Sequence, residues 1–187
     1  MVKEHNWFGD LENIFTKSRH CEPHTIRITR FDTILAHLQT CLTNGIIGEG
    51  FEIILDVKDD NDMIILDDIH AILISSGILA TPLTFYIGLW ARDWVTRANA
   101  LWPSPQRNIF ITWIGEEFTP EILNSLYPAC TAFNIDHRLL SMELMSHVRK
   151  LSGVKLFAWT CNKPNQIALA KALEVDSILT DDPTAVH

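Results

Sequence analysis

The sequence predicts a single α/β domain built on a parallel sheet, and three observations support this. The chain has 187 residues, the length of one domain, with 47% hydrophobic and 20% charged residues, an ordinary globular composition. From residue 51 onward, short apolar runs alternate with amphipathic stretches, and the runs begin roughly 20 to 30 residues apart. Some runs are apolar at consecutive positions, as in Ile53-Ile54-Leu55, which is typical of strands covered on both faces.

Six segments are predicted as strands, and amphipathic helices are expected between them. The strands are Phe51–Val57, Leu83–Leu89, Ile109–Ile114, Thr131–Ile135, Leu156–Thr160 and Ser177–Thr180. Their spacing is that of βα units, so each strand should run parallel to its neighbours. A helix is also expected before the first strand, around Ile34 and Leu35.

Polar residues mark where several of these helices begin. Thr29 followed by Asp32 predicts a capping box for the first helix. Thr119 before Pro120, and Asn162 shortly before Pro164, each place a capping side chain beside a proline suited to a first helical turn. We therefore expect Asn162 to cap the last helix.

Charge and apolar patterning exclude some classes of protein. The net charge of −8 argues against a general nucleic-acid binder, which needs a basic face. Residues 69–91 carry no formal charge, but Ser75-Ser76-Gly77 and Thr81-Pro82 interrupt them, so we expect a helix and a buried strand instead of a transmembrane segment. Met1–Asp10 is too polar for a signal peptide, and we expect a cytoplasmic location or one peripheral to an intracellular membrane.

The four cysteines, Cys21, Cys41, Cys130 and Cys161, show no metal-ligand spacing. We expect them to be free thiols, mostly buried, in a reducing compartment.

Two stretches resemble one enzyme family. Lys155–Pro164, together with Ser177–Pro183, resembles the last βαβ unit of the glycerophosphodiester phosphodiesterase family, and Phe51–Lys58 resembles its third strand. The wider pattern is most similar to fungal phosphatidylglycerol phospholipase C-like members. The resemblance implies a (β/α)8 TIM-barrel-derived fold of the phospholipase C-like phosphodiesterase type, and a hydrolase of lipid metabolism.

The resemblance also implies that the chain is an N-terminally truncated fragment of the family domain. A (β/α)8 barrel typically takes about 250 residues, and only six strands are readable in this sequence. The family carries a His-Arg pair on its first strand, a Glu-x-Asp on its second strand and a His-Asp after it, and we find none of the three in the corresponding places of this sequence. On this comparison residues 1–50 are the connection before the third family strand plus a helix, and residues 51–187 are the third to eighth βα units.

Four residues match family positions that hold metal or substrate. The resemblance implies that Asp56 is a ligand to a divalent metal, Mg²⁺ or Ca²⁺, and that Lys58, on the same strand face, meets the phosphate. From the residues alone, an ordinary charge at a strand end is the favoured interpretation of each. The resemblance likewise implies that Trp159 and Trp90 wall the glycerol part of the substrate, whereas buried tryptophans are more often core.

Two further groups lie near predicted strand ends. His137 is a weak candidate for proton transfer, because histidine titrates near neutral pH but a single loop histidine is usually solvated. Asp181 and Asp182 precede Pro183, and we expect them to organise the closing turn instead of binding metal.

Two functions from different classes follow. One is a metal-dependent phosphodiesterase acting on a glycerophospholipid or glycerophosphodiester. The alternative is a non-catalytic remnant, or a pseudoenzyme that binds phosphate through Lys58. In either case the metal site and the acid/base pair are incomplete, so the 187-residue chain alone is predicted to be inactive. Open sheet edges at Phe51–Val57 and Ser177–Thr180 predict self-association.

Overall fold

The computed structural model of the chain describes residues 29–103 and 108–186. Its centre is one sheet of six strands in the order β1-β2-β3-β4-β5-β6, and every neighbouring pair is parallel. The strands are β1 (Glu52–Val57), β2 (Thr84–Leu89), β3 (Ile109–Gly115), β4 (Ala132–Asp136), β5 (Lys155–Trp159) and β6 (Ser177–Ile178). The predicted sheet of six parallel strands is confirmed.

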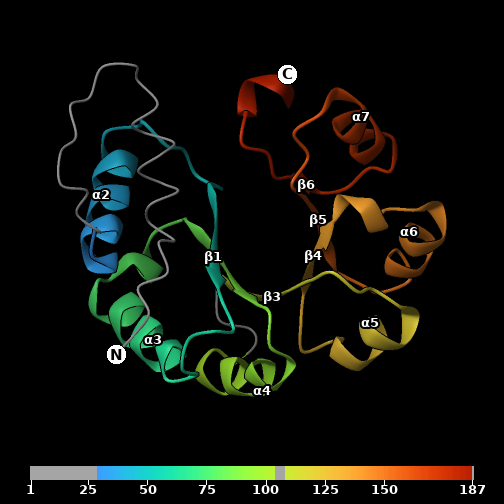
Figure 1. The fold of residues 1–187 in the computed structure, drawn as a ribbon. Helices are drawn as coiled ribbons and strands as arrows, with labels where there is room; N and C mark the ends of the chain where they lie inside the picture. The colour runs from blue at the N-terminus through green and yellow to red at the C-terminus, as the bar shows by residue number, and fades with distance from the viewer. Residues whose placement is uncertain (1–28, 104–107, 187) are drawn as a thin grey trace.

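Helices connect the strands and lie on the outer side of the curved sheet (Figure 1). They are α2 (Phe31–Thr43), α3 (Ile65–Ser75), α4 (Arg92–Leu101), α5 (Pro120–Leu126), α6 (Met142–Val148) and α7 (Pro164–Ala172), with short 3-10 turns η1 (Ile78–Ala80), η2 (His137–Leu139) and η3 (Pro183–Val186). Within the described residues, β1 pairs only with β2 and β6 only with β5, so the sheet curls without closing.

The two faces of the sheet pack differently, which explains the consecutive apolar residues. Phe85, Ile87 and other outward-facing side chains join the main core beneath the helices. Tyr86 and Phe157 point to the inner side of the curve, where they form a second, smaller apolar cluster. Because successive strand residues alternate between these two buried environments, both sets must be apolar.

An ion pair on the inner face connects strands that are not neighbours. The Glu52 Oε1 atom, at the start of β1, accepts a hydrogen bond from Lys155 Nζ at 2.5 Å and one from the Tyr86 hydroxyl at 3.2 Å. Burial disfavours the charged form of Lys155, but its hydrogen bonds to Glu52 and Tyr86 raise the pKa of this ammonium group to about 12. The pair therefore ties the first strand to the fifth across the concave side.

The first five strands begin and end within one residue of their predicted bounds, but two other predictions differ from the structure. The capping box at Thr29 does not form: α2 begins at Phe31 after Arg30, and Asp32 is engaged by the Arg30 guanidinium. The last strand is shorter than predicted, although the Leu179 N–H still donates to Ala158 O at 2.8 Å. By contrast, Thr119 Oγ1 accepts from the Ile122 N–H at 3.3 Å, so the predicted cap of α5 is confirmed.

The apolar stretch includes part of a helix and a buried strand, and the three cysteines that the structure describes are buried, as expected. Residues 69–91 contribute the end of α3 and all of β2, and none of the helices described within residues 29–103 and 108–186 is long and apolar enough to cross a bilayer. Cys41, Cys130 and Cys161 are buried free thiols, and burial raises the pKa of Cys130 to about 12. Cys21 lies among residues 1–28, outside the described residues, as does more than half of the segment 1–50 that was predicted to precede the third family strand.

Candidate functional site

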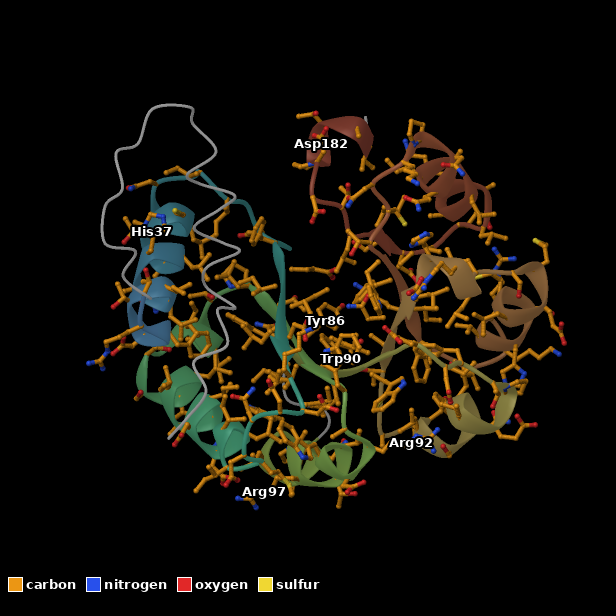
Figure 2. The ribbon with its side chains drawn as sticks, viewed as in Figure 1. His37, Tyr86, Trp90, Arg92, Arg97 and Asp182 are labelled. Atoms are coloured by element: carbon orange, nitrogen blue, oxygen red, sulfur yellow. The ribbon has the colours of Figure 1, made fainter. Side chains whose placement is uncertain are left out.

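The carboxyl ends of the parallel strands point to one mouth of the curved sheet, and four of the predicted site residues meet there. Asp56 lies near the end of β1, and Trp90 directly follows β2. Asp56 on β1 pairs in register with Gly88 on β2. Trp90 therefore lies two residues further along the chain than the residue opposite Asp56. Figure 2 shows Trp90 on the inner side of the sheet, close to Tyr86.

Asp56, Lys58 and Trp90 form one contact group. The Lys58 Nζ donates to Asp56 Oδ2 at 3.0 Å, and the Trp90 indole N–H donates to Asp56 Oδ1 at 2.6 Å. The same Lys58 Nζ lies 4.1 Å from the centre of the Trp90 ring, a distance at which a cation is attracted to the ring face. The mouth therefore has a cation, a carboxylate and an aromatic face within one group.

Burial dominates the electrostatics of the Asp56 carboxyl group. Only 18% of its side chain is exposed, and this desolvation raises the pKa of Asp56. The hydrogen bond from Trp90 and the charge of Lys58 oppose the shift without cancelling it. Asp56 is therefore a carboxylate that gains from an additional positive charge.

Trp159, at the end of β5, brings the second aromatic ring. Its indole N–H donates to the backbone oxygen of Asn134 at 3.0 Å. Its ring lies 5.5 Å from that of Trp90 with an interplanar angle of 63°, an edge-to-face arrangement. The structure thus brings together all four of the residues proposed for metal and substrate, Asp56, Lys58, Trp90 and Trp159.

A second carboxylate, Asp136, ends β4 and is satisfied by its own loop. Arg138 donates to it from its backbone N–H at 2.8 Å, from Nε at 2.9 Å and also from a terminal guanidinium nitrogen. These Arg138 contacts outweigh burial and hold the pKa of Asp136 below its usual range. Both oxygens of the Asp136 carboxylate accept hydrogen bonds from Arg138, so Asp136 caps the turn that follows β4.

His137 is half-buried beside Asp136, with both ring nitrogens in contact with other groups. Its Nδ1 lies 3.3 Å from the Trp159 backbone oxygen and 3.6 Å from Asp136 Oδ1. Its Nε2 lies 2.7 Å from the amide nitrogen of Gln166, in the first turn of α7. A role in proton transfer stays a prediction, but these contacts hold the ring among protein groups.

Gln166 is the residue that sequence analysis missed. Its Oε1 accepts the backbone N–H groups of Asn162 and Lys163, at 2.9 and 2.8 Å. The expected cap by Asn162 is wrong, because its own Oδ1 accepts from the Thr180 hydroxyl and the Asp181 N–H in the next loop. A glutamine three residues after a helix N-cap is a known capping signal and could have identified it.

The two acidic residues after β6 organise the chain's last turn, as expected. Asp181 Oδ2 accepts from Asn162 Nδ2 at 2.6 Å. Asp182 Oδ1 accepts from the Thr184 N–H and hydroxyl, which lower the pKa of Asp182 and stabilise the start of η3 at Pro183. Figure 2 shows Asp182 well away from Trp90.

The described residues do not fit a divalent metal site on their own. Across residues 29–103 and 108–186, no three His, Cys, Asp or Glu side chains gather closely enough to hold an ion. Mg²⁺ and Ca²⁺ take about six or more oxygen ligands, several of them usually from protein. Asp56 brings one carboxylate, so a metal at this mouth requires oxygens from elsewhere.

A groove runs between α2 and α3, beside the edge of β1 that has no strand partner in the part of the chain that the structure describes. Its volume is about 430 Å³, and its walls are mainly apolar side chains such as Leu38, Ile53 and Ile69. Asp56 and Lys58 line it as well. The polar group at the mouth is therefore continuous with an apolar groove.

Comparisons with known proteins bear on the fold and on the last part of the chain. The profile of the glycerophosphoryl diester phosphodiesterase family matches residues 155–184, which run from β5 into η3. No curated protein sequence gave a significant match.

Solved structures extend the likeness to most of the fold. A Silicibacter pomeroyi protein assigned as a glycerophosphoryl diester phosphodiesterase aligns with a TM-score of 0.65 at 16% identity, over 86% of this chain and 55% of that one. A glycerophosphodiester phosphodiesterase from Parabacteroides distasonis aligns with a TM-score of 0.54 at 17% identity, over 73% and 54%. An Oleispira antarctica phosphodiesterase in complex with the product sn-glycerol-3-phosphate aligns with a TM-score of 0.50 at 16% identity, over 64% and 49%.

The chain thus spans about half the length of the solved structures that it matches. Its six parallel strands and outer helices have the fold of part of a (β/α)8 phosphodiesterase barrel.

Proposed function

We propose that this chain carries the substrate-contacting side of a glycerophosphodiester phosphodiesterase site, of the phosphatidylglycerol phospholipase C-like type. The single observation that carries the proposal is the meeting of Asp56, Lys58, Trp90 and Trp159 at one mouth of the sheet. Lys58 takes the phosphate, the two tryptophans contact the glycerol carbons, and Asp56 contributes one ligand to a divalent metal. The product bound in the Oleispira antarctica structure supports glycerol 3-phosphate as the ligand class.

These residue types suit a phosphodiester. An ammonium group neutralises charge that grows on phosphoryl oxygens during the reaction. When present, a divalent ion polarises the same oxygens. Aromatic faces give glycerol carbons an apolar wall, and the half-buried Trp90–Trp159 pair offers two faces at an angle.

We further propose that hydrolysis belongs to a longer polypeptide with two additional βα units. The proposal is supported by the lack of any three clustered metal-ligand side chains within residues 29–103 and 108–186, and by the match to about half of each solved structure. Purified residues 1–187 should then hydrolyse neither glycerophosphodiesters nor phosphatidylglycerol with Mg²⁺ or Ca²⁺. The alternative, a non-catalytic phosphate-binding remnant, is favoured by the same shortage of metal ligands. Metal-dependent turnover by residues 1–187 would contradict both.

Binding of sn-glycerol 3-phosphate tests the site itself. We expect the ligand to shift the indole N–H signals of Trp90 and Trp159 in an NMR titration, and Lys58→Met to weaken this binding at least several-fold. Lys150→Met is the matched control, because Lys150 is exposed beyond the end of α6. Equal binding by both variants, or shifts confined to other tryptophans, would refute the proposed site.

The open edges of the sheet support a third proposal, that the chain self-associates. Among the described residues, β1 and β6 each have one edge without a strand partner, and backbone groups on such an edge can recruit other strands. The apolar groove beside β1 adds to the driving force. We expect size-exclusion chromatography with light scattering to show species larger than a monomer as the concentration rises. A monodisperse monomer at all concentrations would contradict this. Whether the protein is located in the cytoplasm or at a membrane surface is a question separate from its binding site.

A further inference from the structure

The amide orientation of Gln166 is fixed by its surroundings. Its Oε1 accepts two backbone N–H groups, those of Asn162 and Lys163. Reversing the amide would place its NH₂ group against these two donors, and four N–H hydrogens would then face one another without an acceptor. The amide nitrogen must therefore be the atom that faces His137.

This orientation determines the protonation of His137. The Gln166 nitrogen is a donor and lies 2.7 Å from His137 Nε2, so Nε2 must be the acceptor and carry no proton. The ring proton is then on Nδ1, which donates to the Trp159 backbone oxygen at 3.3 Å. The result is a neutral ring with its proton on Nδ1, held between the start of α7 and the end of β5.

A continuous series of contacts leads from this histidine to the mouth. The backbone of Trp159 is held by His137, and its indole N–H is held by Asn134 O at 3.0 Å. The ring so placed meets Trp90 at 5.5 Å, and Trp90 donates to Asp56. The series joins the β4–β5–α7 side of the mouth to the β1–β2 side.

We propose that His137 and Gln166 are positioning residues that set the angle between Trp159 and Trp90, and hence the shape of the glycerol-contacting wall. The inference rests on the proposed function for what the wall contacts, but not for the geometry. His137 acts through Trp159 and leaves proton transfer to other groups. A proton added at Nε2 would meet the Gln166 NH₂ group, so the arrangement fits only the neutral ring.

The tautomer is the first test. Long-range ¹H–¹⁵N NMR correlations of the histidine rings in wild-type residues 1–187 distinguish a proton on Nδ1 from one on Nε2. We expect His137 to show the Nδ1–H form. Gln166→Glu should shift it toward the form with a proton on Nε2, because a carboxylate keeps the backbone caps and offers an acceptor to the ring. An Nε2–H ring in the wild-type chain would overturn the proposal.

The angle between the rings is the second test. Two indoles 5.5 Å apart couple their electronic transitions, and the coupling appears in circular dichroism as a pair of opposite bands that Trp159→Phe removes. We expect His137→Phe to remove most of this signal and to weaken sn-glycerol 3-phosphate binding several-fold. His137→Asn should keep the signal, because its amide can still donate to the Trp159 oxygen.

His147→Phe is the matched control, since His147 lies on α6 and its Nε2 contacts the Asn124 side chain of α5 at 3.3 Å. It should keep both the coupled signal and the binding. An unchanged signal in His137→Phe would overturn the positioning role while leaving the proposed function intact. If His137→Phe loses the signal but the wild-type chain does not bind glycerol 3-phosphate at all, the positioning role is upheld and the proposed function is refuted.

Discussion

Two carboxylates at the mouth of the sheet have nearly the same local sequence but opposite electrostatic states. Asp56 and Lys58 lie at the end of β1, and Asp136 and Arg138 lie at the end of β4, each with the cation two residues after the acid. The pKa of Asp56 is raised by burial, whereas that of Asp136 is lowered, chiefly by Arg138. Burial is the largest influence on the pKa of Asp56 and the hydrogen bonds from Arg138 are the largest on that of Asp136, so the two cations differ in how far they offset burial.

An arginine fork can occupy a whole carboxylate, and a lysine cannot. Arg138 reaches both oxygens of Asp136, while Lys58 donates to one oxygen of Asp56 and the Trp90 indole takes the other. Asp136 is therefore bound within its own turn. Asp56 depends on a residue from the next strand, so its environment changes with whatever occupies the mouth.

The largest expected difference between the two carboxylates is in catalysis. In a longer polypeptide that is active, Asp56→Ala should reduce hydrolysis of a glycerophosphodiester by at least about 10³-fold, because loss of a metal ligand removes several kcal/mol of charge stabilisation. Asp136→Ala should reduce kcat far less. Steady-state kinetics on both variants makes the comparison, and a greater loss in Asp136→Ala would mean that Asp136, not Asp56, is the metal ligand.

The effects on stability should have the opposite order, with substitution of Asp136 more costly than substitution of Asp56. Asp136→Ala removes several charge-assisted hydrogen bonds from a side chain that is 4% exposed, and we expect a loss of about 2 kcal/mol in the free energy of unfolding. Asp56→Asn should be nearly neutral or stabilising, since it removes a carboxylate that burial disfavours. Urea denaturation of residues 1–187 measures both. A clear destabilisation by Asp56→Asn with none by Asp136→Ala would be inconsistent with this account.

Exchanging the two cations should partly exchange the pKa shifts of the two carboxyl groups. Lys58→Arg should lower the pKa of Asp56 by engaging both of its oxygens, and it should weaken the Trp90 contact. Arg138→Lys should raise the pKa of Asp136. Carboxyl ¹³C NMR titrations of the two variants against the wild-type chain test this, and unmoved titrations in both would show that the choice of cation is unimportant.

The smallest expected effect is on how stability depends on pH. The raised pKa of Asp56 means that its folded form holds its proton more tightly, so its contribution to stability falls as pH rises above the unfolded value of about 3.9. The lowered pKa of Asp136 means the reverse: its stabilisation is present above about 3.9 and is lost as pH falls through the folded pKa.

Thermal melting between acid and neutral pH compares the wild-type chain with Asp56→Asn and Asp136→Asn. The wild-type chain should lose stability through Asp56 as the pH rises toward neutral, and Asp56→Asn should abolish this loss. It should lose stability through Asp136 as the pH falls, and Asp136→Asn should abolish that loss. Parallel curves for all three proteins would show that neither carboxylate has a shifted pKa in the folded state.

The sequence predicted the parts of this molecule that depend on local pattern. Consecutive apolar residues such as Ile53 and Ile54 marked β1, because both faces of the sheet are covered. The spacing of these runs predicted parallel strands, and short motifs brought Asp56 and Trp159 into consideration. Contacts between distant segments were not readable: nothing near Glu52 or Lys155 indicates that they pair across 103 residues.

The last helix shows the same limit on a smaller scale. Asn162 has the residue type and position of a cap, yet its side chain binds the Thr180–Asp181 loop, which approaches only in the folded chain. Gln166 then takes over the exposed N–H groups. Local preference identified the right turn but the wrong residue, because a tertiary contact competed for the same amide.

The ion pair between Glu52 and Lys155 has a consequence for how the protein is made. During synthesis the first strand leaves the ribosome about 100 residues before its partner, and at roughly 5 to 20 residues per second the wait is at least several seconds. Throughout that time the Glu52 carboxylate has no ammonium group of Lys155 to bind, and the inner side of β1 can be reached by chaperones and by other nascent chains. The ion pair can form only once the fifth strand has emerged, so a pause in translation between these two strands would expose the inner side of β1 for longer.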